Sequence, residues 1–157
     1  MLPDKRLPLR IGVGIIVLNK NNDVFVAKRK DNPIDKWQMP QGGVENGEDF
    51  LTAMKRELRE ETSIKSIEII KEINQIYEYE LPKKLIGIVW KGKFRGQKQK
   101  WFITKFIGNE NEININTKHP EFTEWKWIGA DLLPSVIVEF KKSLYLKLLK
   151  EIKLVIV

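Results

Sequence analysis

One acidic cluster at the end of an amphipathic segment constrains this chain more than any other feature. Residues 41–64 read QGGVENGEDFLTAMKRELREETSI, and their pattern predicts a helix over residues 48–62. Glu57, Glu60 and Glu61 then lie near the C-terminal end of the helix, where its dipole disfavours negative charge. The fold must offset that repulsion, and the way it does so indicates the chemistry of the site.

The positions of the three glutamates around the helix separate two explanations. At about 100° per residue, four apolar side chains share one arc that faces the core: Phe50, Leu51, Met54 and Leu58. Glu57 and Glu60 lie beside this arc, whereas Glu61 lies within it. A solvated acidic face is the usual explanation of a charge run. It accounts for Glu60 but leaves Glu61 among apolar neighbours, where burial and like charges raise the pKa of a carboxylate.

A bound divalent cation removes this conflict. The chain has no cysteine and a single histidine, so the available ligands are oxygen atoms, which suit Mg²⁺ or Mn²⁺ better than zinc. The lack of cysteine also suits a reducing cytosol, and the N-terminal MLPDKRLPLR is too charged for a signal peptide. The net charge of +7 favours polyanionic partners such as nucleotides or RNA. We therefore expect a cytoplasmic protein.

The rest of the pattern predicts one α+β domain over residues 1–157. IGVGIIVLN and DVFVAKRK, joined by NKNN, are typical of a β-hairpin, and residues 31–43 are expected to form a loop. Further strands are predicted over residues 67–79, 84–90, 98–107 and 125–128. A last helix is predicted over residues 134–153, with an apolar side chain at every fourth position: Val136, Phe140, Leu144 and Leu148.

The acidic segment resembles the Nudix box, G-x₅-E-x₇-R-E-U-x-E-E-x-G-U with U apolar. The matching residues are Gly42, Glu48, Arg56, Glu57, Leu58, Glu60, Glu61 and Ile64. The departure is Ser63, which stands where the family has glycine. If the helix ends in a left-handed residue, serine costs about 1 kcal/mol more than glycine there. That cost leaves every matching glutamate in place.

This resemblance implies a Nudix fold, an α/β/α sandwich around a mixed β-sheet with the Nudix loop-helix-loop and a C-terminal helix. It also implies metal-dependent hydrolysis of a diphosphate linked to another group. By the resemblance, Glu57, Glu60 and Glu61 bind the metals together with the Gly42 carbonyl, and more than one ion is expected. Glu57 also helps to deprotonate the attacking water. The Glu48–Arg56 pair orients the loop and the helix.

Outside the box, WQMPQGG, LPKKL, GQKQKWF and PEFTEWKWI resemble the bacterial RNA pyrophosphohydrolases, whose close relatives hydrolyse dinucleoside polyphosphates. The likeness implies that Glu121 reaches the metals. It also implies six substrate contacts: Arg10, Arg29, Tyr79, Val138, Phe140 and Lys141. Among these, Arg29 and Phe140 would flank a base, and Tyr79 and Lys141 would contact phosphates. Stacking of this kind is common at single-stranded RNA ends.

Some of these residues have simpler explanations. Phe140 also fits the apolar stripe of the predicted last helix, where it would pack in the core. Lys98 and Lys100 share one strand face, opposite Gln97 and Gln99. They either form a solvated cationic stripe or line a phosphate channel. His119, beside a proline, is expected in a loop and outside the catalytic group.

Three functions stay open from the sequence. The basic charge and the branch motifs favour removal of pyrophosphate from RNA 5′ ends, which leaves a monophosphate and promotes mRNA decay. A dinucleoside polyphosphate hydrolase, with diadenosine tetraphosphate as substrate, would use the same metals. A domain that binds nucleotides or RNA without turnover is supported by Ser63 alone. We expect a monomer that binds neither DNA nor membranes.

Overall fold

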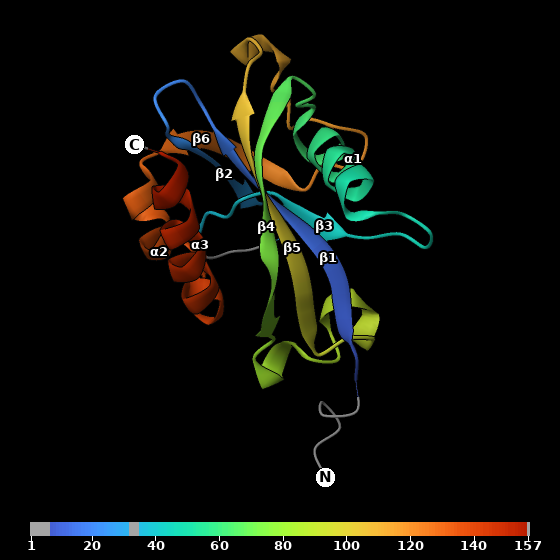
Figure 1. Ribbon diagram of the computed structural model, residues 1–157. Coiled ribbons are helices and arrows are strands. Elements are labelled where there is room, and N and C mark those ends of the chain that lie inside the picture. Colours follow the sequence, from blue (N-terminus) through green and yellow to red (C-terminus); the bar gives the residue numbers. More distant parts are fainter. Residues whose placement is uncertain (1–6, 32–34, 157) are drawn as a thin grey trace.

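A six-stranded mixed β-sheet forms the centre of the protein in the computed structural model, which describes residues 7–31 and 35–156 (Figure 1). The strands are β1 (Leu9–Leu18), β2 (Val24–Arg29), β3 (Gln41–Gly43), β4 (Ile67–Glu80), β5 (Gly96–Phe106) and β6 (Phe122–Ile128). Their order is β4-β5-β1-β2-β6, with β3 paired to β1. The β1–β5 pair is parallel and the other pairs are antiparallel. The expected mixed sheet is confirmed.

Helices cover both faces of this sheet, as Figure 1 shows. They are α1 (Phe50–Thr62), α2 (Leu133–Val136) and α3 (Lys142–Val155). Alternate residues of β1 divide between two cores: Val13, Ile15 and Val17 pack with α1, whereas Ile16 and Leu18 pack with α3. The α/β/α sandwich expected from the sequence is therefore confirmed. Within the described residues, no helix is long and apolar enough to cross a membrane.

Two glycines of β1 make room for large side chains on the α3 side of the sheet. A Cβ atom at Gly14 would lie 2.2 Å from the Trp101 ring, and one at Gly12 would lie 2.4 Å from Oε1 of Gln97. Both distances are far below van der Waals contact, so only glycine permits this packing. The GVG pattern of β1 thus positions the inward-facing residues of β5.

The segment expected to be a loop before α1 contains a strand. Gln41–Gly43 forms β3, in which Gly43 pairs with Gly12 of β1. Local pattern could not reveal this strand, because a glycine pair has no side-chain alternation and its partner is distant in sequence. Residues 32–34 of the expected loop lie outside the described residues, as do residues 1–6 of the N-terminal segment.

The strand expected over residues 84–90 is wrong. The chain instead forms two 3-10 turns, Lys83–Leu85 and Val89–Gly92, between the end of β4 and the start of β5. Its apolar residues pack against the α3-side core from this connection: Leu85, Ile86, Val89 and Trp90. The apolar run therefore reflects packing of a long connection and not the alternation of a strand.

The single helix expected over residues 134–153 is broken. Ile137 and Val138 are extended, with ψ angles of 155° and 148°, and a 3-10 turn over Glu139–Lys141 precedes α3. Ile137 is buried and β-branched, so core packing competes with helix formation at this point. Only Leu144 and Leu148 of the predicted stripe belong to α3. The remaining predicted strands and the hairpin are present, with ends shifted by up to three residues.

Candidate functional site

Helix α1 begins and ends with side-chain bonds that fix the acidic segment. Asp49 caps the N-terminus by accepting a hydrogen bond of 2.7 Å from the Thr52 backbone N–H. Ser63 ends the helix in the left-handed conformation, with φ 66°, as expected for the glycine position of the box. Its hydroxyl donates to the Asn114 carbonyl at 2.8 Å, so the serine anchors the segment that leads to the acidic cleft described below.

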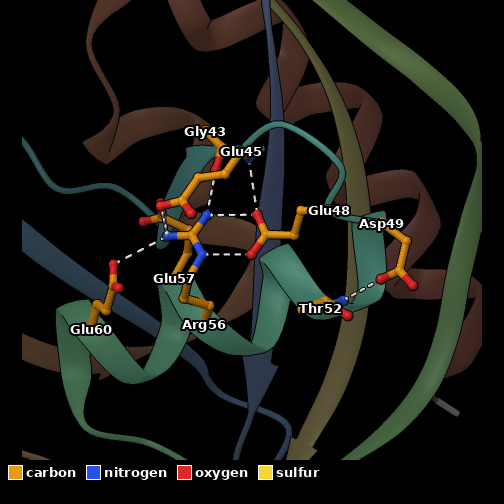
Figure 2. Close-up of polar contacts among 8 residues, drawn as sticks. All are labelled: Gly43, Glu45, Glu48, Asp49, Thr52, Arg56, Glu57 and Glu60. Atoms are coloured by element: carbon orange, nitrogen blue, oxygen red, sulfur yellow. Dashed lines mark hydrogen bonds and ion pairs between the residues drawn. The ribbon is translucent and has the colours of Figure 1, made fainter.

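Arg56 is the centre of a polar network that joins the loop to α1 (Figure 2). Its Nε and Nη2 atoms donate to the two carboxylate oxygens of Glu48 at 2.7 and 2.9 Å, and Nη2 also donates to the Gly43 carbonyl at 2.8 Å. Its Nη1 donates to Glu57 at 2.9 Å and to Glu60 at 3.2 Å. The hydrogen bonds from Arg56 hold the pKa of Glu48 at about 2. The expected Glu48–Arg56 pair is present.

Gly42 allows Glu57 to lie directly against β3. A Cβ atom at Gly42 would be 2.0 Å from the carboxyl carbon of Glu57, so any other residue would displace that carboxylate. Burial raises the pKa of Glu57, although its hydrogen bond with Arg56 opposes the shift. The close contact with Glu57 therefore explains why Gly42 is glycine, and an ordinary turn would not require it.

Glu61 is the most unusual carboxylate of the site. Its side chain is 4% exposed, and Oε2 has no hydrogen-bond partner among the described residues. Burial raises its pKa well above the ordinary value, and the nearby charges of Glu121 and Glu57 raise it further. The expectation that Glu61 faces the protein interior is confirmed. Leu51 differs from expectation because it is 40% exposed and lies outside the core arc.

Four carboxylates line one cleft of about 470 Å³. We call it the acidic cleft; its lining residues are Glu57, Arg59, Glu60, Glu61, Ser63, Thr117, Lys118, His119 and Glu121. Among the described residues, no three acidic or histidine side chains already converge as a preformed metal site, since Glu57 and Glu60 bond to Arg56. The buried, unpartnered oxygen of Glu61 nevertheless fits a cation, because a positive charge would offset its burial.

Sequence reasoning missed part of this lining. His119 lies in a segment without regular structure, as expected, yet it lines the acidic cleft together with Thr117 and Lys118. The local pattern does not place these residues there, because they are distant in sequence from α1, which supplies the other side of the cleft.

A second group of predicted contacts gathers on the α3 side of the sheet. The rings of Tyr79 and Phe140 lie 6.0 Å apart, and Nζ of Lys141 lies 5.2 Å from the centre of the Tyr79 ring. Burial lowers the pKa of Lys141 to about 7; the Arg29 charge adds to this effect and the Glu61 charge opposes it. This lysine therefore lies within electrostatic reach of the acidic cleft. Val138 is half-buried against the same core.

Arg29 links this group to the acidic cleft. Its guanidinium donates two hydrogen bonds of 2.8 Å to Asp31, and Nη1 lies 3.6 Å from a carboxylate oxygen of Glu121. Arg29 is thus beside one of the four cleft carboxylates. Phe140 belongs to the turn before α3 and is only partly buried, so it does not occupy the helical core position considered above.

Buried glutamines of β5 form a polar ladder that the sequence reasoning missed. Gln97 Nε2 donates to the Tyr79 hydroxyl at 2.9 Å, and Gln99 Nε2 donates to the Gln41 side chain at 3.2 Å. Lys98 and Lys100 face the opposite side of β5, where Lys98 is exposed and Lys100 donates to the Asn74 carbonyl. The structure therefore does not bring these lysines to Tyr79 and Lys141. Strand alternation alone could have shown this separation.

Arg10 lies at a second cleft, of about 370 Å³, that shares Glu57 with the acidic cleft. Its guanidinium carbon is 5.4 Å from the centre of the Trp90 ring. We call this the Trp90 cleft; it is lined by Leu9, Arg10, Ile11, Gly43, Val44, Glu45, Glu57 and Phe94. The two clefts therefore meet at one carboxylate of α1.

This chain is similar to known proteins over most of its length. The NUDIX domain profile matches residues 8–148. The RNA pyrophosphohydrolase of Pelagibacter ubique is 61% identical over 147 residues, which cover 94% of this chain and 93% of that protein. The RNA pyrophosphohydrolase of Rickettsia conorii is 49% identical over 145 residues, covering 92% and 90%.

Solved structures show the same fold at lower identity. The E. coli dihydroneopterin triphosphate pyrophosphohydrolase superposes with a TM-score of 0.71 at 21% identity, covering 91% of this chain and 97% of that one. A C. elegans Ap4A hydrolase in a binary complex gives a TM-score of 0.64 at 21% identity, covering 90% and 98%. These two likenesses concern the fold alone.

Proposed function

The chain belongs to the Nudix family, and from this premise we propose that it is an RNA 5′-pyrophosphohydrolase. The reaction removes pyrophosphate from the 5′-triphosphate end of RNA and leaves a 5′-monophosphate, which promotes mRNA decay. The observation that supports the proposal is the ion pair of Arg29 with Glu121 of the acidic cleft. The Arg29 charge also acts on Lys141, which lies against Tyr79 and Phe140. The 61% identity to an RNA pyrophosphohydrolase over nearly the whole chain supports the same substrate.

Nudix hydrolases generally use divalent metal ions. For this chain we propose Mg²⁺ or Mn²⁺, with more than one ion, held by Glu57, Glu60, Glu61, Glu121 and the Gly42 carbonyl. The ions would neutralise phosphate charge and activate water. The unpartnered oxygen of Glu61 supports this ligand set. Glu57 and Glu60 also accept hydrogen bonds from Arg56, so a metal would compete with Arg56 for these carboxylates.

The residues of the chain then divide into three roles. Glu57, whose pKa is raised by burial, accepts a proton from the attacking water. Arg56 and Glu48 hold the loop against α1 and so position Glu57. Tyr79 and Lys141 contact the phosphates, and Arg10 contacts the RNA strand. A base lies against Phe140, Arg29 and Val138, because aromatic rings and guanidinium planes stack on the unpaired bases of RNA ends.

The setting of this reaction follows from the substrate. We propose that the chain acts as a monomer and as one domain over residues 1–157, in the cytoplasm, on RNA and not on DNA or membranes. The net charge of +7 and the lack of cysteine support this setting.

Specificity constants test the choice of substrate. Purified protein with Mg²⁺ is incubated with 5′-triphosphorylated RNA and, separately, with diadenosine tetraphosphate, and kcat/KM is measured for each. We expect the RNA value to be the larger. A larger value for diadenosine tetraphosphate would assign the chain to dinucleoside polyphosphate hydrolysis, and turnover of neither would support a binding domain.

A further inference from the structure

The connection between β4 and β5 contains backbone conformations that its residues do not favour. Trp90 has φ 53° and ψ 37°, and Lys91 has φ 58° and ψ 26°, so two consecutive residues with side chains are left-handed. Among the described non-glycine residues, the two others with positive φ are Asn22, in the β1–β2 hairpin turn, and Ser63, at the end of α1. Backbone strain that no hairpin turn or helix end explains is typical of ligand-binding segments.

The strained backbone places Trp90 against two residues that line the Trp90 cleft, Arg10 and Phe94. The Arg10 guanidinium lies over the indole ring, and Phe94 meets that ring edge-on at 6.1 Å and 80°. Gly43 gives Arg10 its space, since a Cβ atom there would lie 2.3 Å from Nη2 of Arg10. Ile11, also in the cleft wall, is 47% exposed. The result is an aromatic and guanidinium surface beside an apolar wall.

The connection that carries Trp90 is strongly basic. Residues 81–95 contain five cationic side chains and no acidic one: Lys83, Lys84, Lys91, Lys93 and Arg95. Arg95 pairs with Glu80, whereas the four lysines are exposed and pair with no carboxylate in the part of the chain that the structure describes. Lys98, also exposed, is in register with Ile11.

We propose that the Trp90 cleft binds a nucleotide of the RNA strand downstream of the 5′ end. Its base stacks on the Arg10–Trp90 pair, and the strand phosphates lie along Lys91 and Lys93. Sequence-tolerant single-strand sites combine these two features, a cationic path and aromatic stacking surfaces. The proposal rests on the proposed function, because the cleft shares Glu57 with the acidic cleft and so receives a strand whose end is held there.

The unpaired lysines of this connection favour an RNA strand over the second nucleoside of a dinucleoside polyphosphate as the ligand. Each additional nucleotide of a strand adds a phosphate charge, whereas the second nucleoside ends the chain of charges. If an RNA strand binds here, affinity should rise with RNA length and should depend on Trp90, Lys91 and Lys93.

Binding measurements test the cleft without requiring turnover. RNA of eight nucleotides with a 5′-monophosphate and a 3′-fluorophore is titrated with protein, and Kd is read from fluorescence anisotropy. We expect Trp90→Ala to weaken binding by about 5- to 150-fold, the range measured for one stacked base. Trp90→Phe should keep most of the affinity. A two-nucleotide RNA should show little difference between the variants.

Salt dependence isolates the phosphate contacts. Replacing Lys91 and Lys93 by alanine removes two contacts, so the slope of log Kd against log salt should fall by about 1.4. The matched control replaces Lys147 and Lys150, exposed lysines of α3, and should leave the slope unchanged. Equal effects of both pairs would contradict the proposal.

Turnover assays distinguish a failure of the cleft proposal from a failure of the proposed function. If the chain hydrolyses triphosphorylated RNA, Trp90→Ala should lower kcat/KM for the octanucleotide more than for the dinucleotide. An equal loss on both lengths, or a loss confined to diadenosine tetraphosphate, would overturn the proposal. Failure to hydrolyse RNA at all would refute the proposed function, whereas the anisotropy data would still decide whether the cleft binds RNA.

Discussion

Replacing Glu61 by glutamine should stabilise the metal-free protein. The wild-type side chain is 4% exposed, and one of its oxygens has no partner among the described residues, so folding either buries a charge or forces protonation. An unsatisfied buried polar group costs about 1–3 kcal/mol, and a charged one costs more. Glutamine has nearly the same shape without the charge, and its amide can donate to neighbouring carboxylates. We therefore expect Glu61→Gln to raise the free energy of unfolding by about 1–3 kcal/mol.

Urea and thermal unfolding in EDTA measure this gain. For a chain of this size the gain corresponds to a rise in Tm of about 2–12 °C. The matched control is Glu60→Gln on the same helix, whose side chain is 56% exposed and makes an i,i+4 bond to Arg56. That variant should change stability by at most about 0.5 kcal/mol.

Magnesium should reverse the order. Ligand binding at a thousand times Kd adds about 4.1 kcal/mol, which exceeds the gain expected from Glu61→Gln. The wild type should gain this stabilisation, and Glu61→Gln should gain much less. A metal-free Glu61→Gln protein that is less stable than the wild type would refute the reasoning, because Glu61 would then contribute favourable contacts of its own.

Three further perturbations test separate parts of the site. Phe140→Ala should lower kcat/KM for triphosphorylated RNA by about 5- to 150-fold through lost stacking, with a much smaller loss on a nucleoside triphosphate. Equal losses of kcat/KM on both substrates, together with a large fall in Tm, would show that Phe140 has a packing role instead. Lys141 has a folded pKa of about 7, below its ordinary value of 10.5, so the unfolded chain binds a proton that the folded chain lacks. Urea midpoints should therefore fall as pH falls from about 10.5 to 7, and Lys141→Met should reduce that dependence; an unchanged slope would contradict the shift. Ser63→Gly relieves about 1 kcal/mol of backbone strain but loses a hydrogen bond worth about 0.5–1.5 kcal/mol, so its free energy of unfolding should stay within about 1 kcal/mol of the wild type. Ser63→Ala should lower the free energy of unfolding by the full value of that hydrogen bond. A marked loss of stability in Ser63→Gly alone would contradict this balance.

The sequence predicted those parts of the fold that a local period defines. Helix α1 and the inward position of Glu61 follow from the spacing of Met54 and Leu58, which are both fully buried. The β1–β2 hairpin follows from two β-rich runs and a turn of asparagines. In both segments the local pattern and the tertiary packing agree, so the shorter-range signal was sufficient.

Other parts depend on contacts between distant residues. Strand β3 exists because Gly12 and Gly43 pair, and the break before α3 exists because Ile137 enters the core. Gln97 needs the space left by Gly12, and Trp101 needs the space left by Gly14; both spaces become visible only once β1 and β5 are paired. No local period contains this information, so the predicted strand over residues 84–90 and the unbroken last helix were both wrong.

The most direct measurement is the release of pyrophosphate from 5′-triphosphorylated RNA by the wild type and by Glu57→Gln. Each protein is assayed with Mg²⁺, in EDTA, and after Mg²⁺ is restored, with circular dichroism to compare the folds. The account predicts wild-type turnover that disappears in EDTA and returns with Mg²⁺, and Glu57→Gln turnover lower by orders of magnitude with an unchanged fold. Near-normal turnover by Glu57→Gln, or turnover in EDTA, would contradict the assignment of the acidic cleft as the catalytic metal site.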